Sequence, residues 1–273
     1  MSTELIKIAI LDLYNGSENQ GMRCLRELIY QFSVENSVQI KIDEFEVRQK
    51  KQIPGLDFDI FISSGGPGNP LERSKNEWEK PYFQWLDNIL QYNADENNRR
   101  KKKVFFICHS FQLACKHFNI GKITKRKSTS FGVFPIHIIN DDILLKDLTN
   151  PFYAVDNRDY QVVNVNNNDS TQNIHTILAI EKERKHIPLE RSVMAIRFNK
   201  HMIGTQFHPE ADVEGMLLHL HSADKKEMVI QNHGLEKWQK MIEQLNDSNK
   251  IALTHKTIIP NFISLFIKQL NND

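Results

Sequence analysis

The feature that most constrains the fold of this chain is an alternation of short apolar runs with segments of helical periodicity. Apolar, β-rich runs occupy 6–13, 58–63 and 104–107, and a half-buried alternation occupies 38–47. Strands that are apolar throughout are buried on both faces, as in parallel sheets covered by helices. The pattern predicts an α/β fold with an open, mostly parallel sheet and helices on both faces. The predicted helices are 18–32, 76–92 and 108–118.

From 122 to 207 the pattern becomes strand-rich, and after Glu210 it becomes helical. The strands expected in this part are 131–139, 176–181, 193–198 and 202–207. We therefore expect one domain over 1–212 and a helical extension over 213–273 that packs on it. The alternative is that the extension is a docking surface, a dimer face or a lid. Exposure of Trp238, Phe262 and Phe266 would favour that alternative.

Composition and charge exclude several classes of protein. Hydrophobic residues make up 40% and charged residues 25%, which is typical of a globular chain and not of a disordered one. Lys and Arg number 35 against 34 Asp and Glu, so no nucleic-acid partner is expected. No run reaches the ~20 apolar residues of a membrane span, and no signal peptide is evident. Three cysteines suit a reducing compartment, so we expect a cytoplasmic protein.

Cys108 stands where the apolar run 104–107 meets a predicted helix. Ligands of open α/β sheets bind beyond the carboxyl ends of the strands, and a sharp strand-to-helix turn exposes its central side chain there. The partial positive charge of a helix N-terminus also lowers the pKa of a cysteine. Cys108 is therefore a candidate nucleophile, although a lone cysteine after an apolar run is more often simply buried. Cys24 and Cys115 are interpreted as buried structural cysteines.

Two further motifs follow predicted strands. In His208-Pro209-Glu210 the extended backbone before proline lets the side chains of His208 and Glu210 point the same way, as a base and its orienting carboxylate do. A surface histidine and a helix-capping glutamate fit equally well. The glycines of 65–68 let the backbone direct an N–H at an oxyanion, although a plain tight turn is simpler. A parallel sheet would bring these motifs and Cys108 to one edge, as acyl transfer requires.

Two basic runs, 99–103 and 122–127, could dock an acidic partner. Because the overall charge is balanced, we expect both to be solvated loops instead.

On these motifs the chain resembles the class I (triad) glutamine amidotransferases. The residues that carry the resemblance are Gly65-Gly66-Pro67-Gly68-Asn69-Pro70, Cys108 with Gln112, and Gly204-Thr205-Gln206-Phe207-His208-Pro209-Glu210. The resemblance covers about residues 5–215 and implies a flavodoxin-like fold. The glutaminase domain of GMP synthase is one of several similar relatives.

The resemblance implies a catalytic triad of Cys108, His208 and Glu210. Cys108 would attack the side-chain amide of glutamine to form a thioester, His208 would protonate the departing ammonia and then activate water, and Glu210 would orient His208. The backbone N–H groups of Gly66 and His109 would form the oxyanion hole.

The resemblance also implies a substrate-binding set and the partners. Gln112 would hold the amino-acid end of the substrate, and the segment 157–162, with Asp159 and Tyr160, would line the glutamine pocket. Neither a metal nor another cofactor is implied. Because 211–273 is too short for a synthetase and no Walker-type loop occurs, ammonia is expected to pass to a synthetase subunit in trans.

The motif around Cys108 departs from the family pattern, which usually reads G-x-C-x-G-x-Q. Phe106 and Ser110 replace the two glycines. A sharp turn crowds both positions, and phenylalanine fits only if its side chain points away from the turn. Three hypotheses follow: a glutaminase of the amidotransferase type, a hydrolase of small γ-glutamyl conjugates that needs no partner, and a non-catalytic binding or regulatory relative.

Overall fold

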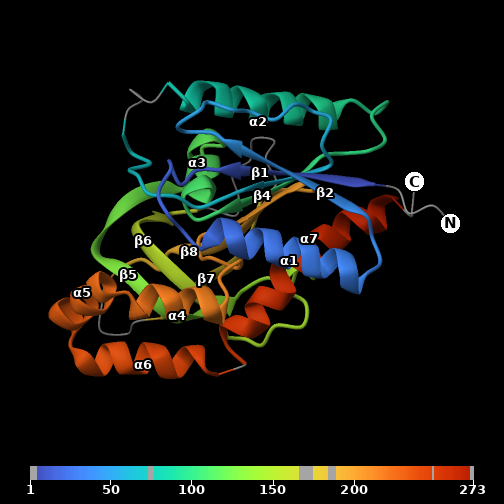
Figure 1. Cartoon of the computed structure of the whole chain (residues 1–273). Helices are drawn as coiled ribbons and strands as arrows, with labels where there is room; N and C mark the ends of the chain where they lie inside the picture. Colours follow the sequence, from blue (N-terminus) through green and yellow to red (C-terminus); the bar gives the residue numbers. More distant parts are fainter. Residues whose placement is uncertain (1–4, 73–76, 166–174, 184–188, 248, 271–273) are drawn as a thin grey trace.

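The computed structural model describes residues 5–72, 77–165, 175–183, 189–247 and 249–270. In this part of the chain, one nine-stranded sheet has the order β2-β1-β3-β4-β9-β8-β7-β5-β6 (Figure 1). The strands are β1 (Ile6–Asp12), β2 (Ile40–Glu46), β3 (Ile60–Ser63), β4 (Lys103–Ile107), β5 (Lys122–Ile138), β6 (Phe152–Val163), β7 (Thr176–Glu181), β8 (Val193–Asn199) and β9 (Met202–Thr205).

The sheet is mixed, with a parallel half that contains the predicted apolar strands. β2, β1, β3, β4 and β9 pair in parallel, whereas β8, β7, β5 and β6 extend the sheet through antiparallel pairs. Hairpin connections suit antiparallel pairs, and long helical crossovers suit parallel ones. The predicted α/β class is therefore confirmed.

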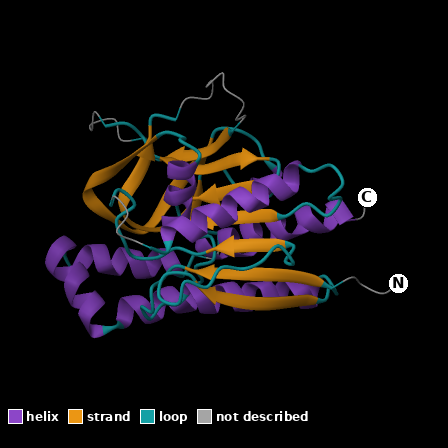
Figure 2. Ribbon diagram, turned by 90° about the horizontal axis from the view of Figure 1, so that it is seen from above, coloured by secondary structure: helices purple, strands orange, loops and turns teal. Residues whose placement is uncertain are grey.

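Helices cover both faces of the sheet, as Figure 2 shows from above. α1 and α7 pack on one face, around Phe32, Phe105 and Phe262, and α2 and α3 pack on the other, around Trp85 and Phe111. The helices are α1 (Gly21–Glu35), α2 (Glu79–Ala94), α3 (His109–His117), α4 (Val213–His221), α5 (Ala223–His233), α6 (Leu235–Leu245) and α7 (Ile251–Leu270), with a short 3-10 helix η1 (Ile143–Leu145). No helix of the described residues is long and apolar enough to cross a bilayer.

The aromatic residues of the C-terminal helices are buried or partly buried. Phe262 and Phe266 of α7 are buried against the sheet. α4, α5 and α6 form a separate cluster on β5 and β6, in which Trp238 is partly buried and its Nε1 donates to the carbonyl of Leu220 at 3.2 Å. The exposure that would favour a docking surface is therefore not observed for these aromatic residues. The boundary at 212/213 stays a prediction.

Strand β6 was not predicted, because its centre is polar. Asp156 and Arg158 nevertheless point inward, where Arg158 Nε donates to Asp156 Oδ1 at 2.8 Å and Ser130 donates to the same carboxylate at 2.7 Å. A buried ion pair whose hydrogen bonds are satisfied can occupy a sheet interior, and sequence periodicity carries no sign of it.

The prediction that both basic runs are solvated loops is only partly right. Residues 99–102 form a loop, but residues 122–125 pair with β6 as part of β5, although Lys122 and Lys125 are exposed. In the other run, Lys102 and Lys103 are buried, and Arg100 donates to both carboxylate oxygens of Asp59, at 2.6 and 2.7 Å. Asp59 also accepts the backbone N–H of Lys7 at 2.9 Å, so one buried carboxylate ties β1 to the start of β4.

We predict that Asp59→Ala lowers the free energy of unfolding by about 3 kcal/mol, because it removes the carboxylate from a buried ionic network. Urea denaturation measures the change. Asp57→Ala is the matched control, since Asp57 is exposed and forms a loose ion pair with Lys7, at 3.6 Å; it is expected to cost less than about 1 kcal/mol. Equal losses for the two variants would contradict this account of the network.

Candidate active site

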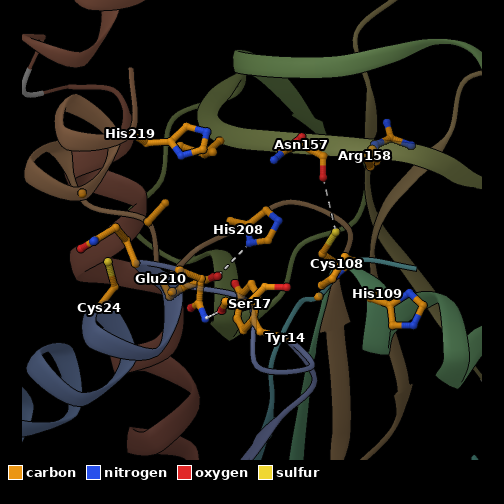
Figure 3. A pocket seen from close by; sticks show the side chains of 18 of the residues that line it. Tyr14, Ser17, Cys24, Cys108, His109, Asn157, Arg158, His208, Glu210 and His219 are labelled. Carbon is orange, nitrogen blue, oxygen red and sulfur yellow. Dashed lines mark hydrogen bonds and ion pairs between the residues drawn. The ribbon is translucent and has the colours of Figure 1, made fainter. Parts of the chain in front are cut away.

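A cavity of about 460 Å³ opens at the carboxyl edge of the parallel strands, within the ~300–1,000 Å³ typical of ligand sites. It is bordered by the segments that follow β1, β3, β4 and β9, by the middle of β6, and by the N-terminal parts of α1 and α4 (Figure 3). Every site residue that the sequence singled out lines this cavity: Gly66, Cys108, His109, Gln112, Asp159, Tyr160, His208 and Glu210.

Cys108 forms the turn between β4 and α3 and has φ 49° and ψ −98°. A positive φ is uncommon for a residue with a side chain, and such strain gathers at functional sites. The turn is held in place because the N–H of Cys108 donates to Thr205 O at 2.8 Å and its carbonyl accepts from Gln112 N at 3.1 Å. The thiol therefore lies at the N-terminus of α3, facing the cavity.

Phe106 fits this turn because its side chain points away from it. The ring is fully buried on the face covered by α2 and α3, with its centroid 5.6 Å from that of Phe198. Phe106 lies opposite Gly204 of the neighbouring strand β9. A Cβ added to Gly204 would come within 3.0 Å of Phe106 Cβ and 3.1 Å of the Phe106 carbonyl oxygen. Phenylalanine at 106 is thus accommodated by glycine at 204.

Ser110 fastens the turn to the sheet. Its buried hydroxyl accepts a hydrogen bond from Ile107 N at 2.8 Å and donates to Ser63 O at 2.7 Å. The first contact holds the last residue of β4, and the second reaches the end of β3. The hydroxyl therefore makes connections that a glycine at this position could not make.

His208 and Glu210 meet as expected for an extended segment before and after a proline. His208 Nδ1 lies 2.8 Å from Glu210 Oε1, and the N–H of His208 donates to Val155 O at 2.8 Å (Figure 3). Burial favours the neutral imidazole, but the charges of Glu210 and Cys108 and hydrogen bonds to both outweigh it. Together they hold the pKa of His208 well above 6.5.

The glycine loop after β3 passes close to both side chains. A Cβ on Gly65 would lie 2.8 Å from His208 Cε1 and 3.5 Å from Cys108 Cβ, and a Cβ on Gly66 would overlap the carbonyl oxygen of Leu13. Only glycine allows this approach. Arg48 donates to the carbonyl oxygens of Pro67 and Leu13 and so connects the loop to the end of β1.

Gln206 is a site residue that the sequence analysis did not single out. Its side chain is fully buried, and its Nε2 donates to Cys108 Sγ at 3.8 Å. Gln112 Nε2 in turn donates to Gln206 Oε1 at 3.1 Å and to Tyr160 O at 3.2 Å, which links the thiol to β6. The position of Gln206 in the quoted motif, two residues before His208, was the available signal.

The other predicted substrate-binding residue, Asp159, is exposed at the cavity rim and accepts a hydrogen bond from Thr129 Oγ1 at 2.6 Å. Met216 and His219 of α4 also line the cavity and were not predicted. Among the described residues, no group of three or more metal-ligating side chains could hold a metal ion.

The other two cysteines differ from Cys108 in their surroundings. Burial raises the pKa of Cys24 to about 12, and Asp212 contributes. Burial alone raises the pKa of Cys115 well above 9. Neither thiol has an imidazole partner in the described structure, whereas Cys108 interacts with the imidazole of His208.

The model of the family glutamine amidotransferase class-I matches residues 10–216, and the chain belongs to this family. No curated protein sequence matches it significantly.

Solved structures resemble the chain over nearly its whole length. A glutamine amidotransferase from Thermotoga maritima has a TM-score of 0.68 at 12% identity, covering 96% of this chain and 98% of that one. A candidate GMP synthase subunit from Thermoplasma acidophilum has a TM-score of 0.58 at 16% identity, covering 99% of each chain. The glutaminase domain of Trypanosoma brucei CTPS, with bound acivicin, has a TM-score of 0.55 at 12% identity, covering 98% and 95%. At these identities the likeness shows a shared fold.

We predict that Ser110→Ala lowers the free energy of unfolding by about 1–3 kcal/mol, because it leaves Ile107 N–H and Ser63 C=O buried with one partner fewer. Urea denaturation with Ser17→Ala as control tests this. Ser17 lines the same cavity but is exposed, so its loss is expected to change stability by less than about 0.5 kcal/mol. A Ser110→Ala protein as stable as the control would show that the hydroxyl does not fasten the turn.

We predict that Glu210→Gln lowers the pKa of His208, because the carboxylate is the strongest influence that raises it. An NMR titration of the imidazole C–H resonances measures the shift, with exposed Glu214→Gln as the control. The stabilisation from the His208–Glu210 pair should be complete below about pH 6.5 and lost as pH rises through the higher pKa of the folded protein. An unchanged His208 titration in Glu210→Gln would contradict the assignment of the cause.

Proposed function

We propose that this protein hydrolyses the side-chain amide of glutamine to glutamate and ammonia through a thioester on Cys108. One observation carries the proposal. The Cys108 thiol lies in a strained turn at a helix N-terminus and interacts with the imidazole of His208, which is hydrogen-bonded to the buried carboxylate of Glu210. Membership of the class I family supports the same reaction.

In the first half-reaction, Cys108 Sγ attacks the amide carbon, and the C=O electron pair moves onto oxygen. The N–H groups of Gly66 and His109 would bind this oxyanion. His109 begins α3, so its N–H has no acceptor within the helix, and the helix dipole adds positive potential. His208, which holds the proton, delivers it to the nitrogen as the C–N bond breaks and ammonia leaves.

In the second half-reaction, water takes the place of ammonia. His208 accepts a proton from the water, whose oxygen attacks the thioester carbon. The C–S bond then breaks, which releases glutamate and returns Cys108 as a thiolate with the proton on His208, as at the start of the cycle. Glu210, bonded to Nδ1, keeps Nε2 of His208 directed at the reacting atoms in both halves. Gln112, Asp159 and Tyr160 would hold the amino-acid end of the substrate on the β6 side of the cavity.

A second candidate, hydrolysis of small γ-glutamyl conjugates, is supported by the extent of the cavity. The cavity does not end at Cys108 but continues between α1 and α4, past Phe131 and Met216. A leaving group larger than ammonia has room there, whereas a glutaminase needs none.

We further propose that the ammonia passes to a synthetase subunit in trans and that the protein works in the cytoplasm. Membership of the class I family supports the transfer of ammonia. The three unpaired cysteines support the cytoplasmic location.

We predict that the purified protein releases glutamate from glutamine and that Cys108→Ala abolishes the release, whereas Cys24→Ala retains most of it. A coupled glutamate assay measures the rate. The same assay with γ-glutamyl-p-nitroanilide gives kcat/KM for a bulky leaving group, and a higher value than for glutamine would favour the conjugate hydrolase.

Acivicin, found bound in the T. brucei structure, tests the site without a partner. If Cys108 is the nucleophile, acivicin should label it at one equivalent and leave Cys24 and Cys115 unmodified. Absence of both turnover and Cys108 labelling would reject the catalytic proposal and favour a binding or regulatory role.

A further inference from the structure

A second hollow, of about 440 Å³, lies at the opposite edge of the sheet from Cys108. We call it the basal hollow and define it by three cations, Lys103, Lys200 and Lys268, and three apolar side chains, Ile203, Phe262 and Leu265. Lys103 begins β4, the strand whose other end carries Cys108, so the length of the strand separates the two sites. α7 supplies Phe262, Leu265 and Lys268 to its lining, and the β8–β9 hairpin supplies Lys200 and Ile203.

Lys103 is a buried cation without a carboxylate partner among the described residues. It is only 6% exposed, and its ammonium group donates to His201 Nδ1 at 3.0 Å and to Lys200 O at 3.5 Å. Both acceptors are neutral, because burial and surrounding cations lower the pKa of His201 to about 4. A buried ammonium is normally paired with an anion, so this one lacks its usual partner.

Neighbouring cations add to the unbalanced positive charge around Lys103. Burial, followed by the charges of Lys200 and Arg197, lowers the pKa of Lys103 to about 8. Arg197 is already paired, with Nε and Nη2 each 2.7 Å from an oxygen of Asp142. The described residues that line the hollow include no aspartate or glutamate. The local excess of positive charge is therefore not balanced within the described chain.

The lining also suggests what kind of anion would fit. The three lysines come from different elements, namely β4, the β8–β9 turn and α7, and lysine binds phosphate as a point charge, whereas the fork of Arg197 is committed to Asp142. Beside the cations lie Ile203, Phe262 and Leu265, which would contact an apolar group. The volume exceeds what inorganic phosphate needs.

We propose that the basal hollow binds a small organic phosphate that joins its phosphate group to an apolar body. The phosphate lies between Lys103, Lys200 and Lys268, and the apolar body lies on the α7 side. This site is independent of the proposed glutaminase reaction, so it stands or fails without it.

Isothermal titration of the intact protein with 1-naphthyl phosphate tests the proposal. Saturable binding of 1-naphthyl phosphate is expected. Weaker binding is expected of 1-naphthoate, which lacks the second negative charge, of inorganic phosphate, which lacks the apolar body, and of 1-naphthol, which is neutral. Equal binding of 1-naphthol would show an apolar pocket only, and equal binding of 1-naphthoate would overturn the choice of phosphate.

Variants locate the site. Lys103→Met keeps the length of the buried side chain and removes its charge, and it should weaken binding about tenfold. Lys200→Met changes an exposed residue, so it tests the same point if Lys103→Met does not fold. The control is Lys240→Met, which removes the charge of an exposed side chain on α6 and should leave binding unchanged. No saturable binding, or binding that neither Lys103→Met nor Lys200→Met weakens, would overturn the proposal.

The pH dependence supplies a further readout. Above pH 7 naphthyl phosphate stays a dianion, because its second pKa is about 6, and His201 stays neutral. Affinity should therefore fall as pH rises above about 8, where Lys103 loses its proton, and Lys103→Met should abolish that fall. An affinity that is constant from pH 7 to pH 9.5 would contradict a role for Lys103.

Discussion

The positive φ of Cys108 is the constraint on which the site depends. A residue with a side chain adopts it only where its surroundings compensate for the strain. Here the compensation comes from both sides of the turn. Thr205 O anchors the N–H of Cys108, and the hydroxyl of Ser110 joins the turn to β3. On the strand before the turn, Phe106 fits because Gly204 of the neighbouring strand leaves room for it. The two departures from the family motif are therefore matched by the structure around them.

Cys108 differs from Cys24 and Cys115 in the charged groups that surround its thiol. Each is buried, and burial by itself raises the pKa of a thiol, as it does for Cys24 and Cys115. Cys108 alone meets an imidazole whose protonated form is favoured by a buried glutamate. In the proposed reaction, this favoured cation would stabilise the negative charge that develops during acyl transfer.

Sequence reasoning succeeded where local patterns coincide with global structure. Apolar strands such as 58–63 and 104–107 are buried on both faces, and the motifs that follow them meet at one edge. It failed where long-range pairing decides the outcome. Arg158 enters the sheet because it pairs with Asp156 and donates to Ser192 Oγ, and Lys102 is buried because Asp59 lies nearby. Gln206 contacts the thiol although periodicity marks it only as part of a strand end. Most of these contacts join residues that are far apart in the sequence, so local sequence patterns do not predict them.

The central claim is that the turn around Cys108 holds a reactive thiol although Phe106 and Ser110 replace the family's glycines. The most direct test is the rate of iodoacetamide alkylation of each cysteine, followed by mass spectrometry, with Cys24 and Cys115 as internal controls. The account predicts that Cys108 is modified rapidly and that His208→Asn slows its modification, while the other two cysteines react only on unfolding. Alkylation of Cys108 that is no faster than that of Cys24, or that is unaffected by His208→Asn, would contradict it.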